Sequence, residues 1–159
     1  ASDVYKRQVV VYAQALGVSE EKMYRAVLLS DLVTIYLKQG IGKLSAYCGA
    51  VSAGCGSGAG IAYLHNMSDE QIEHVVENAL AINSGIICDG AKSSCAAKIA
   101  MAVEGGLMGF DMAKAERNFV VGDGIVQETT DETIAAVGKI ASQGMVETDK
   151  EIIDVMLGL

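Results

Sequence analysis

Residues 47–60 read Tyr47-Cys48-Gly49-Ala50-Val51-Ser52-Ala53-Gly54-Cys55-Gly56-Ser57-Gly58-Ala59-Gly60. The stretch consists almost wholly of glycine, alanine, serine and cysteine, and it leads into the apolar residues Ile61 to Leu64. Each glycine inside a helix costs about 1 kcal/mol relative to alanine, so the four glycines from Gly54 to Gly60 need a reason. The expected reason is that another helix or a bulky cofactor lies against them. Residues 48–64 are therefore predicted to form a central helix.

The rest of the chain is typical of amphipathic helices. Ser68-Asp69-Glu70-Gln71 is a capping box that opens one helix, and apolar residues follow it at helical spacing. Ser19 is expected to cap a long helix that is apolar nearly all round and should therefore be buried. A second central small-residue helix is predicted over residues 91–103, then a shorter polar one over 111–119. No alternating strand pattern competes with these readings, so the predicted fold is all-α, a multi-helix domain with central small-residue helices.

The composition narrows the class of function. The chain has 159 residues and a formal net charge of −8, which argues against nucleic acid as a partner. No apolar run is long enough for a membrane span, so no membrane partner is expected. Four cysteines without a secretory signal indicate a reducing compartment, and we expect a cytoplasmic location.

The start of the chain suggests a segment of a longer protein. Residues 1–8 show no clear pattern and are interpreted as a non-native or disordered leader, which leaves residues 9–159 as one helical domain. A helix from Val9 to Leu16 begins abruptly without a cap, and Gly17 is expected to end it. We therefore expect a C-terminal portion of a larger lyase, with the missing N-terminal portion as a partner.

Four cysteines fall in two pairs, Cys48 with Cys55 and Cys88 with Cys95, each pair separated by six residues. A zinc site would bring the sulfurs to roughly 3.8 Å from one another. Seven residues of helix rise about 10.5 Å, so a helical pair cannot share one zinc ion. An iron–sulfur cluster is a larger object and tolerates wider spacing. The spacing alone does not separate a cluster from zinc in loops or from four structural cysteines.

Several stretches together resemble the iron–sulfur serine dehydratase alpha-chain family, closest to its L-cysteine desulfidase branch. The resemblance is carried by residues 48–60, by Asn83-Ser84-Gly85-Ile86-Ile87-Cys88-Asp89, by Ser93-Ser94-Cys95, and by the tail segments 122–126 and 144–152. It covers nearly all of the chain from about Val9 on.

The resemblance implies a mainly helical protein that holds a 4Fe–4S cluster through three cysteines. Members of the family eliminate water or hydrogen sulfide from L-serine or L-cysteine, which gives pyruvate and ammonia. Carried over by position, the metal and cofactor ligands are Cys48, Cys88 and Cys95, and Cys55 is spare. Three protein ligands leave one iron open as a Lewis acid.

The same resemblance leaves other roles unassigned. Serine dehydratases can cap the open iron with a C-terminal cysteine, and the absence of one after Met156 favours the desulfidase side. The family's substrate-contacting residues and proton acceptor lie largely upstream, so the catalytic residues are unknown and this segment alone is expected to be inactive. The expected partner is a small amino-acid substrate, and self-association into a homo-oligomer is left open.

Two further readings compete with these. Lys92 and Lys98 flank Cys95 and could favour a thiolate or an anionic substrate, or they could be ordinary surface lysines near a helix start. A non-enzymatic helical module that binds zinc or buries its cysteines is the rival to the lyase.

Overall fold

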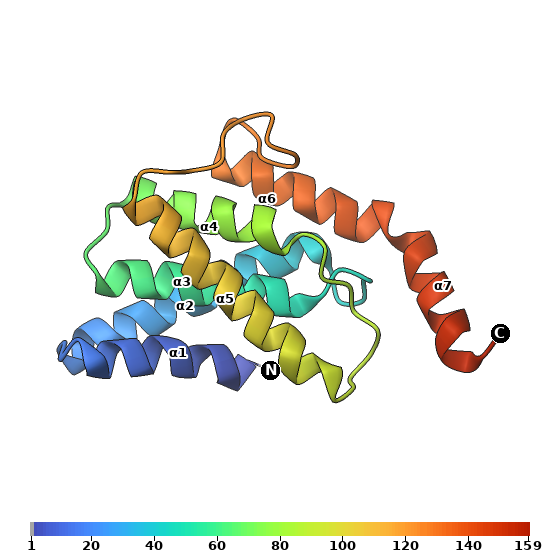
Figure 1. Cartoon of the computed structure of the whole chain (residues 1–159), viewed down its shortest axis with the longest axis horizontal. Coiled ribbons are helices and arrows are strands. Elements are labelled where there is room, and N and C mark those ends of the chain that lie inside the picture. The colour runs from blue at the N-terminus through green and yellow to red at the C-terminus, as the bar shows by residue number, and fades with distance from the viewer. Residues whose placement is uncertain (1) are drawn as a thin grey trace.

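The computed structural model describes the backbone of residues 2–159 and the side chains of residues 6–159. Within this range the chain forms seven α-helices and one π-helical turn, with no strand (Figure 1). The all-α prediction is confirmed. No helix of the described chain is both long enough and apolar enough to cross a membrane.

The helix α3 (Gly49–Leu64) lies at the centre of the bundle and contacts α1, α2, α4 and α5. Every residue from Val51 to Ala62 is buried. A β-carbon added to Gly54 would lie 2.0 Å from the carbonyl oxygen of Ala102 in α5, and one added to Gly60 would lie 2.9 Å from the carbonyl oxygen of Ala26 in α2. Neighbouring helices on opposite sides of α3 thus explain its glycines. This is the first of the two predicted reasons, close approach of another helix.

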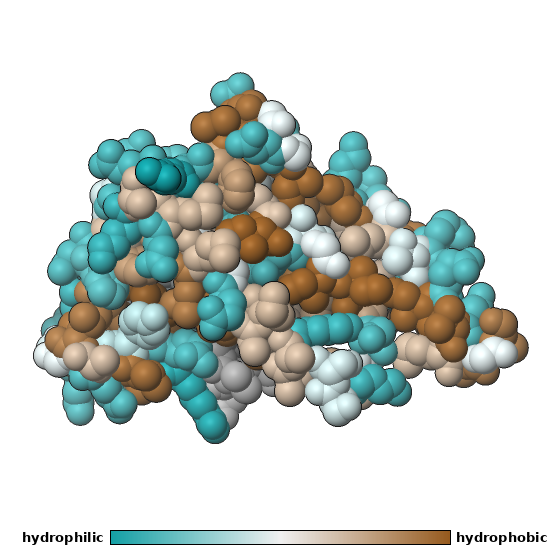
Figure 2. Space-filling model, viewed as in Figure 1, coloured by the Kyte–Doolittle hydropathy of each residue, from teal (hydrophilic) through white to brown (hydrophobic). Residues whose placement is uncertain are grey.

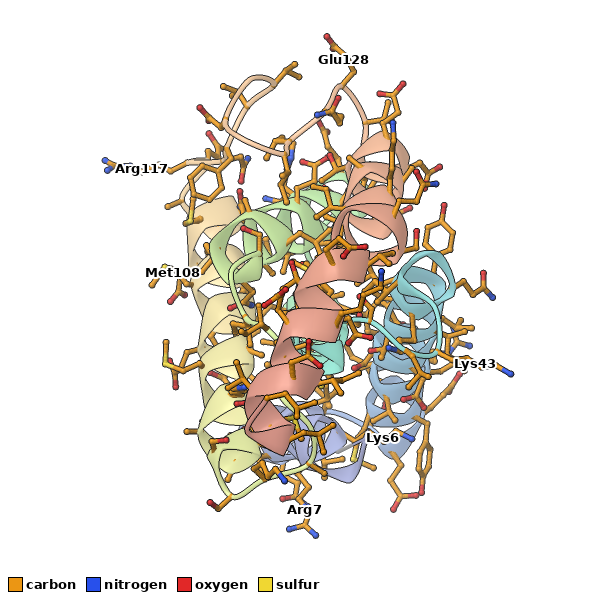
Figure 3. All side chains as sticks on the ribbon, turned by 90° about the vertical axis from the view of Figure 1, so that its right-hand side faces the viewer. Lys6, Arg7, Lys43, Met108, Arg117 and Glu128 are labelled. Carbon is orange, nitrogen blue, oxygen red and sulfur yellow. The ribbon has the colours of Figure 1, made fainter. Side chains whose placement is uncertain are left out.

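The helix α5 (Ser94–Lys114) crosses α3 and α4 on one side of the bundle (Figure 1). The prediction that a helix over 91–103 ends before a separate helix over 111–119 is wrong, because one helix runs through both glycines of the pair Gly105-Gly106. These glycines do not break α5; they allow close packing, since a β-carbon on Gly105 would meet the Asn83 side chain and one on Gly106 the backbone of Gly54. The outer face of α5 stays exposed, and Met108 points away from the bundle (Figure 3).

Two helices precede α3. α1 (Ser2–Ala15) begins earlier than the predicted Val9 and includes most of the leader 1–8, whose origin stays a prediction; Ala1 lies outside the described residues. It is followed by Gly17 with a left-handed backbone (φ +62°), as predicted. α2 (Glu20–Ile41) is capped by Ser19, whose side chain accepts a hydrogen bond from the Lys22 N–H.

The expectation that α2 is buried holds for only one of its faces. Its inner face packs on α3, whereas four large apolar side chains on its outer face are each more than half exposed: Tyr24, Leu28, Leu32 and Ile35. Since these residues recur at helical spacing, α2 is apolar all round, as its sequence indicates, but only its inner face is covered.

Of the three remaining helices, α4 and α6 pack into the bundle and α7 extends away from it. α4 (Asp69–Asn83) begins with the predicted capping box, in which both hydrogen bonds between Ser68 and Gln71 are present. α6 (Thr130–Lys139) packs on α2 and α4 and continues through the π-helical turn η1 (Ile140–Gly144). α7 (Val146–Leu157) extends away from the bundle (Figure 1), contacts η1 among the elements, and has no buried residue.

Candidate functional site

Cys48 and Cys88 lie at opposite ends of a short antiparallel bridge, as diagonal neighbours on its two strands. The Cys48 N–H donates to the Ile86 carbonyl at 3.1 Å, and the Cys88 N–H donates to the Ala46 carbonyl at 2.6 Å. The two residues between these bonds, Tyr47 and Ile87, form an isolated β-bridge. The segment before α3 and the segment after α4 are therefore joined by backbone hydrogen bonds that the two cysteine N–H groups donate.

Cys95 reaches the same region from the first turn of α5. Its thiol lies 3.3 Å from the Gly90 carbonyl, and the Lys92 N–H donates to its sulfur at 3.4 Å. Gly90 adopts a left-handed backbone (φ +82°), which glycine tolerates without a steric cost. The chain thereby turns between Cys88 and α5 and brings Cys95 back toward the bridge.

The electrostatics of Cys48 show which groups surround it. Burial raises the pKa of the Cys48 thiol, the Ala50 N–H lowers it, and the neighbouring Cys88 and Cys95 thiols raise it further, while the Lys98 ammonium lowers it. Cys88 and Cys95, from two other segments, therefore lie near enough for their charges to act on Cys48. Cys48 is also the N-cap residue of α3, with no side-chain capping bond, so its sulfur lies at the positive end of a helix dipole.

Cys55 is excluded from this group. It lies in the middle of α3 and is fully buried, and burial raises the pKa of its thiol to about 12. Its neighbour Tyr47 is buried as well, and burial, followed by the Cys55 and Cys48 thiols, raises the Tyr47 pKa far above its usual value. A neutral, dry thiol of this kind is typical of a packing residue rather than a ligand.

The described side chains do not form a site for a single metal ion. Among the side chains of residues 6–159, no group of three or more His, Cys, Asp or Glu residues could hold a metal ion. The donor set nevertheless suits a four-iron cluster, which binds thiolates at separate corners. Cys48 and Cys95 lie at two helix N-termini, whose partial positive charge suits thiolate ligands, and Cys88 lies between them in sequence.

Two side chains at this site lack a clear signal in the sequence. Lys98 donates from Nζ to Asp89 Oδ1 at 2.5 Å and to the Ile87 carbonyl at 2.9 Å. Lys38, in the last turn of α2, lies close to the start of α3, since its Nζ would be 3.7 Å from a β-carbon on Gly49. The sequence analysis named Lys98 together with Lys92, either as residues that favour a thiolate or an anionic substrate or as ordinary surface lysines. It did not name Lys38, because the approach of α2 to Cys48 depends on tertiary packing.

Cavities near the thiols are shallow and mostly apolar. One of about 450 Å³ lies between the end of α4 and α5 and includes Ile87, Lys98 and Met101; another of about 410 Å³ lies between Ile87 and α7. A third cavity, of about 610 Å³, lies between α2, α4 and α6, and no cysteine lines any of these three cavities. We place the candidate site at the thiols, because their chemistry and not the cavity size distinguishes it.

Apolar surface borders this region. Figure 2 shows apolar residues along α5 and α7 on the face that Figure 1 presents. Met101 in α5 and Val155 in α7 are among the most exposed of them.

Comparison with known proteins finds relatives that match nearly the whole chain. A UPF0597 protein of Desulfitobacterium hafniense is 56% identical over 149 residues, which cover 94% of this chain and 35% of that protein. UPF0597 proteins of Lachnoclostridium phytofermentans and Finegoldia magna are 50% and 47% identical, and the chain covers 36% of each. The chain thus spans about a third of the length of the curated relatives it matches. No solved structure matches it significantly.

A family model supplies the assignment. The model for the serine dehydratase alpha chain matches residues 8–154, which is nearly the whole chain and includes all four cysteines. The match runs from α1 into α7 and so takes in every segment that contributes to the thiol site. This chain belongs to the serine dehydratase alpha chain family.

Proposed function

We propose that this chain is the cluster-binding portion of a lyase that removes water from L-serine or hydrogen sulfide from L-cysteine. In this reaction the substrate loses its α-proton and its β-hydroxyl or β-thiol, which gives aminoacrylate. Aminoacrylate tautomerises to an imine, and water hydrolyses the imine to pyruvate and ammonia. The observation that supports the proposal is that Cys88 and Cys95 lie near enough for their charges to act on the Cys48 thiol, whereas Cys55 is enclosed in the core.

The three thiols of Cys48, Cys88 and Cys95 would hold a 4Fe–4S cluster. When bound through three thiolates, such a cluster supplies an open iron that acts as a Lewis acid toward the leaving group. The chain's own residues supply the setting. The Lys92 N–H donates to the Cys95 sulfur, and Lys98 places a positive charge near Cys48 and Cys95.

The relatives' length sets the scope of the proposal. Because the chain spans about a third of those proteins, the base that takes the α-proton is left unassigned. The proposal includes either serine or cysteine as the substrate. It also includes a cytoplasmic location and self-association into a homo-oligomer. The rival function is a helical module without catalysis that binds zinc or buries its cysteines.

The first test is cluster binding by this chain. After anaerobic reconstitution with iron and sulfide, we expect a brown protein with about four irons per polypeptide, as a 4Fe–4S cluster requires. Cys48→Ser, Cys88→Ser and Cys95→Ser should each lose most of this iron, since each removes one of three ligands. Cys55→Ser is the matched control and should keep most of it.

The outcome that contradicts the ligand assignment is loss of iron in Cys55→Ser together with its retention in Cys48→Ser. A colourless wild-type protein that binds zinc tightly would support the rival module. The lyase reaction is tested separately on the longer polypeptide, by measuring pyruvate released from L-serine and from L-cysteine under anaerobic conditions.

A further inference from the structure

The segments of Cys48 and Cys88 are joined by backbone hydrogen bonds, whereas the segment of Cys88 is joined to the helix of Cys95 by a side chain. The backbone bridge fixes Cys48 to Cys88. Among the described residues, the hydrogen bonds that join residues 87–89 to α5 are both made by Lys98. The remaining bonds of Cys95 are local, to Gly90 and Lys92 in the turn that precedes it.

Lys98 is well placed for this role. It lies three residues after Cys95, one turn along α5, so its side chain shares a face of the helix with that thiol. Its side chain is only 22% exposed, although it carries a charge. The ammonium donates to the carbonyl of Ile87 and to the carboxylate of Asp89, the residues directly before and after Cys88. It therefore fixes the Cys88 segment to α5.

Its charge acts on the thiols as well. The hydrogen bond to Asp89 is the main cause that raises the pKa of Lys98, and the Cys48 and Cys95 thiols contribute to the rise. The same hydrogen bond is the main cause that lowers the pKa of Asp89. The Lys98 ammonium therefore offsets the charge of the Asp89 carboxylate, which it contacts at 2.5 Å directly after Cys88 in the sequence.

We infer that Lys98 is the positioning residue of the thiol site, because it holds the segment of Cys88 against the helix of Cys95 and offsets the negative charge there. The inference rests on the proposed function in naming a cluster as the ligand. Residues that orient the ligands of a metal site typically change affinity by about 10- to 100-fold when they are lost.

The main variant is Lys98→Met, which keeps the length of the side chain but removes its charge and both hydrogen bonds. We expect the reconstituted cluster to be lost to an iron chelator about 10- to 100-fold faster than from the wild type. Lys98→Arg should recover most of the loss, since it keeps the charge and the donors. Lys114→Met, at the far end of the same helix, is the control and should leave the rate unchanged.

A second measurement does not need a cluster. In a background with both Cys48 and Cys55 replaced by serine, a short thiol cross-linker should join Cys88 to Cys95 in the apo protein, and Lys98→Met should lower the yield several-fold. Thermal unfolding of each variant checks that the helical bundle is retained. A Lys98→Met protein that is folded and matches the wild type in both cross-linking and cluster loss overturns the inference.

The two measurements separate the inference from the proposed function. If the wild type takes up no cluster under any reconstitution, the proposed function fails. The cross-linking yield then still decides the role of Lys98, since a lower yield in Lys98→Met supports it and an equal yield overturns it.

Discussion

Two cysteines of one helix have opposite environments. Cys48 stands at the N-cap of α3 among other thiols, whereas Cys55 lies two turns further in, enclosed by core side chains. The sequence predicted this separation, because seven residues of helix place the two sulfurs far apart along the axis. What the spacing could not supply is the direction of Cys48, which depends on the bridge between Tyr47 and Ile87.

The buried thiol of Cys55 should make stability depend on pH in the alkaline range. Its pKa rises from 9.0 to about 12 on folding, so the folded protein keeps a proton that the unfolded chain releases. The stabilisation is therefore complete below pH 9 and is lost as the pH rises toward 12. Between about pH 8 and about pH 10, the wild type should lose about 1.4 kcal/mol of unfolding free energy relative to Cys55→Ala.

Urea unfolding of both proteins at the two pH values measures this difference. Other alkaline groups titrate in both proteins, so their effect cancels when the two are compared. A difference in unfolding free energy that does not change with pH would mean that the Cys55 thiol is not held neutral in the folded state.

At the scale of elements, close helix contacts explain the glycines better than helix propensity does. Alanine is favoured over glycine by about 1 kcal/mol in an isolated helix. In Gly54→Ala, however, the new β-carbon would lie 2.0 Å from the Ala102 carbonyl oxygen, and backbone atoms cannot rotate away as a side chain can. We expect a net loss of at least about 1–3 kcal/mol in unfolding free energy, measured in urea.

Gly85→Ala is the matched control for this substitution. No atom lies within 4 Å of the added β-carbon, and Gly85 is not among the glycines with positive φ. Its unfolding free energy should stay unchanged or rise by about 0.4–1 kcal/mol, because alanine restricts the unfolded chain. Equal effects of the two substitutions would contradict the close contact between α3 and α5.

The same contacts show where sequence reasoning succeeds and where it stops. The capping box at Ser68 and the cap at Ser19 depend on neighbouring residues alone, and both were predicted correctly. The pair Gly105-Gly106 was misread as a helix end, since its partners Asn83 and Gly54 are distant in sequence. Likewise, Thr148-Asp149-Lys150-Glu151 has the sequence pattern of a capping box, but α7 begins at Val146 without a side-chain cap.

For the whole molecule, the sequence identified the fold class and a central small-residue helix, because glycine-rich apolar segments suit crowded positions. It could not show that the outer face of α2 stays uncovered, since Tyr24 and Leu28 are as apolar as residues of the inner face. Burial is a property of the assembled bundle and not of one helix. The ligand set was assigned by resemblance, and the structure adds the contacts that bring the three segments together.

The helix α7 should be the least stable helix of the molecule. It has no buried residue, its contacts with other elements are confined to η1, and Val155 and Leu157 are 77% and 67% exposed. Its contact with the cysteine loop is made by Met156, whose methyl group lies near Gly90. Helices with few buried apolar contacts open locally at a small fraction of the global free energy of unfolding.

Hydrogen exchange measured by mass spectrometry tests this expectation. Amides of α7 should exchange several orders of magnitude faster than those of α3, which opens only with the whole bundle. α4 is the control, since it has a similar length but a capping box and a buried stripe, and it should be protected like α3. Protection of α7 equal to that of α4 would mean that contacts beyond η1 and Gly90 hold it in place. If α7 instead opens easily, the loop that carries Cys88 and leads to Cys95 becomes accessible without unfolding of the core that fixes Cys48.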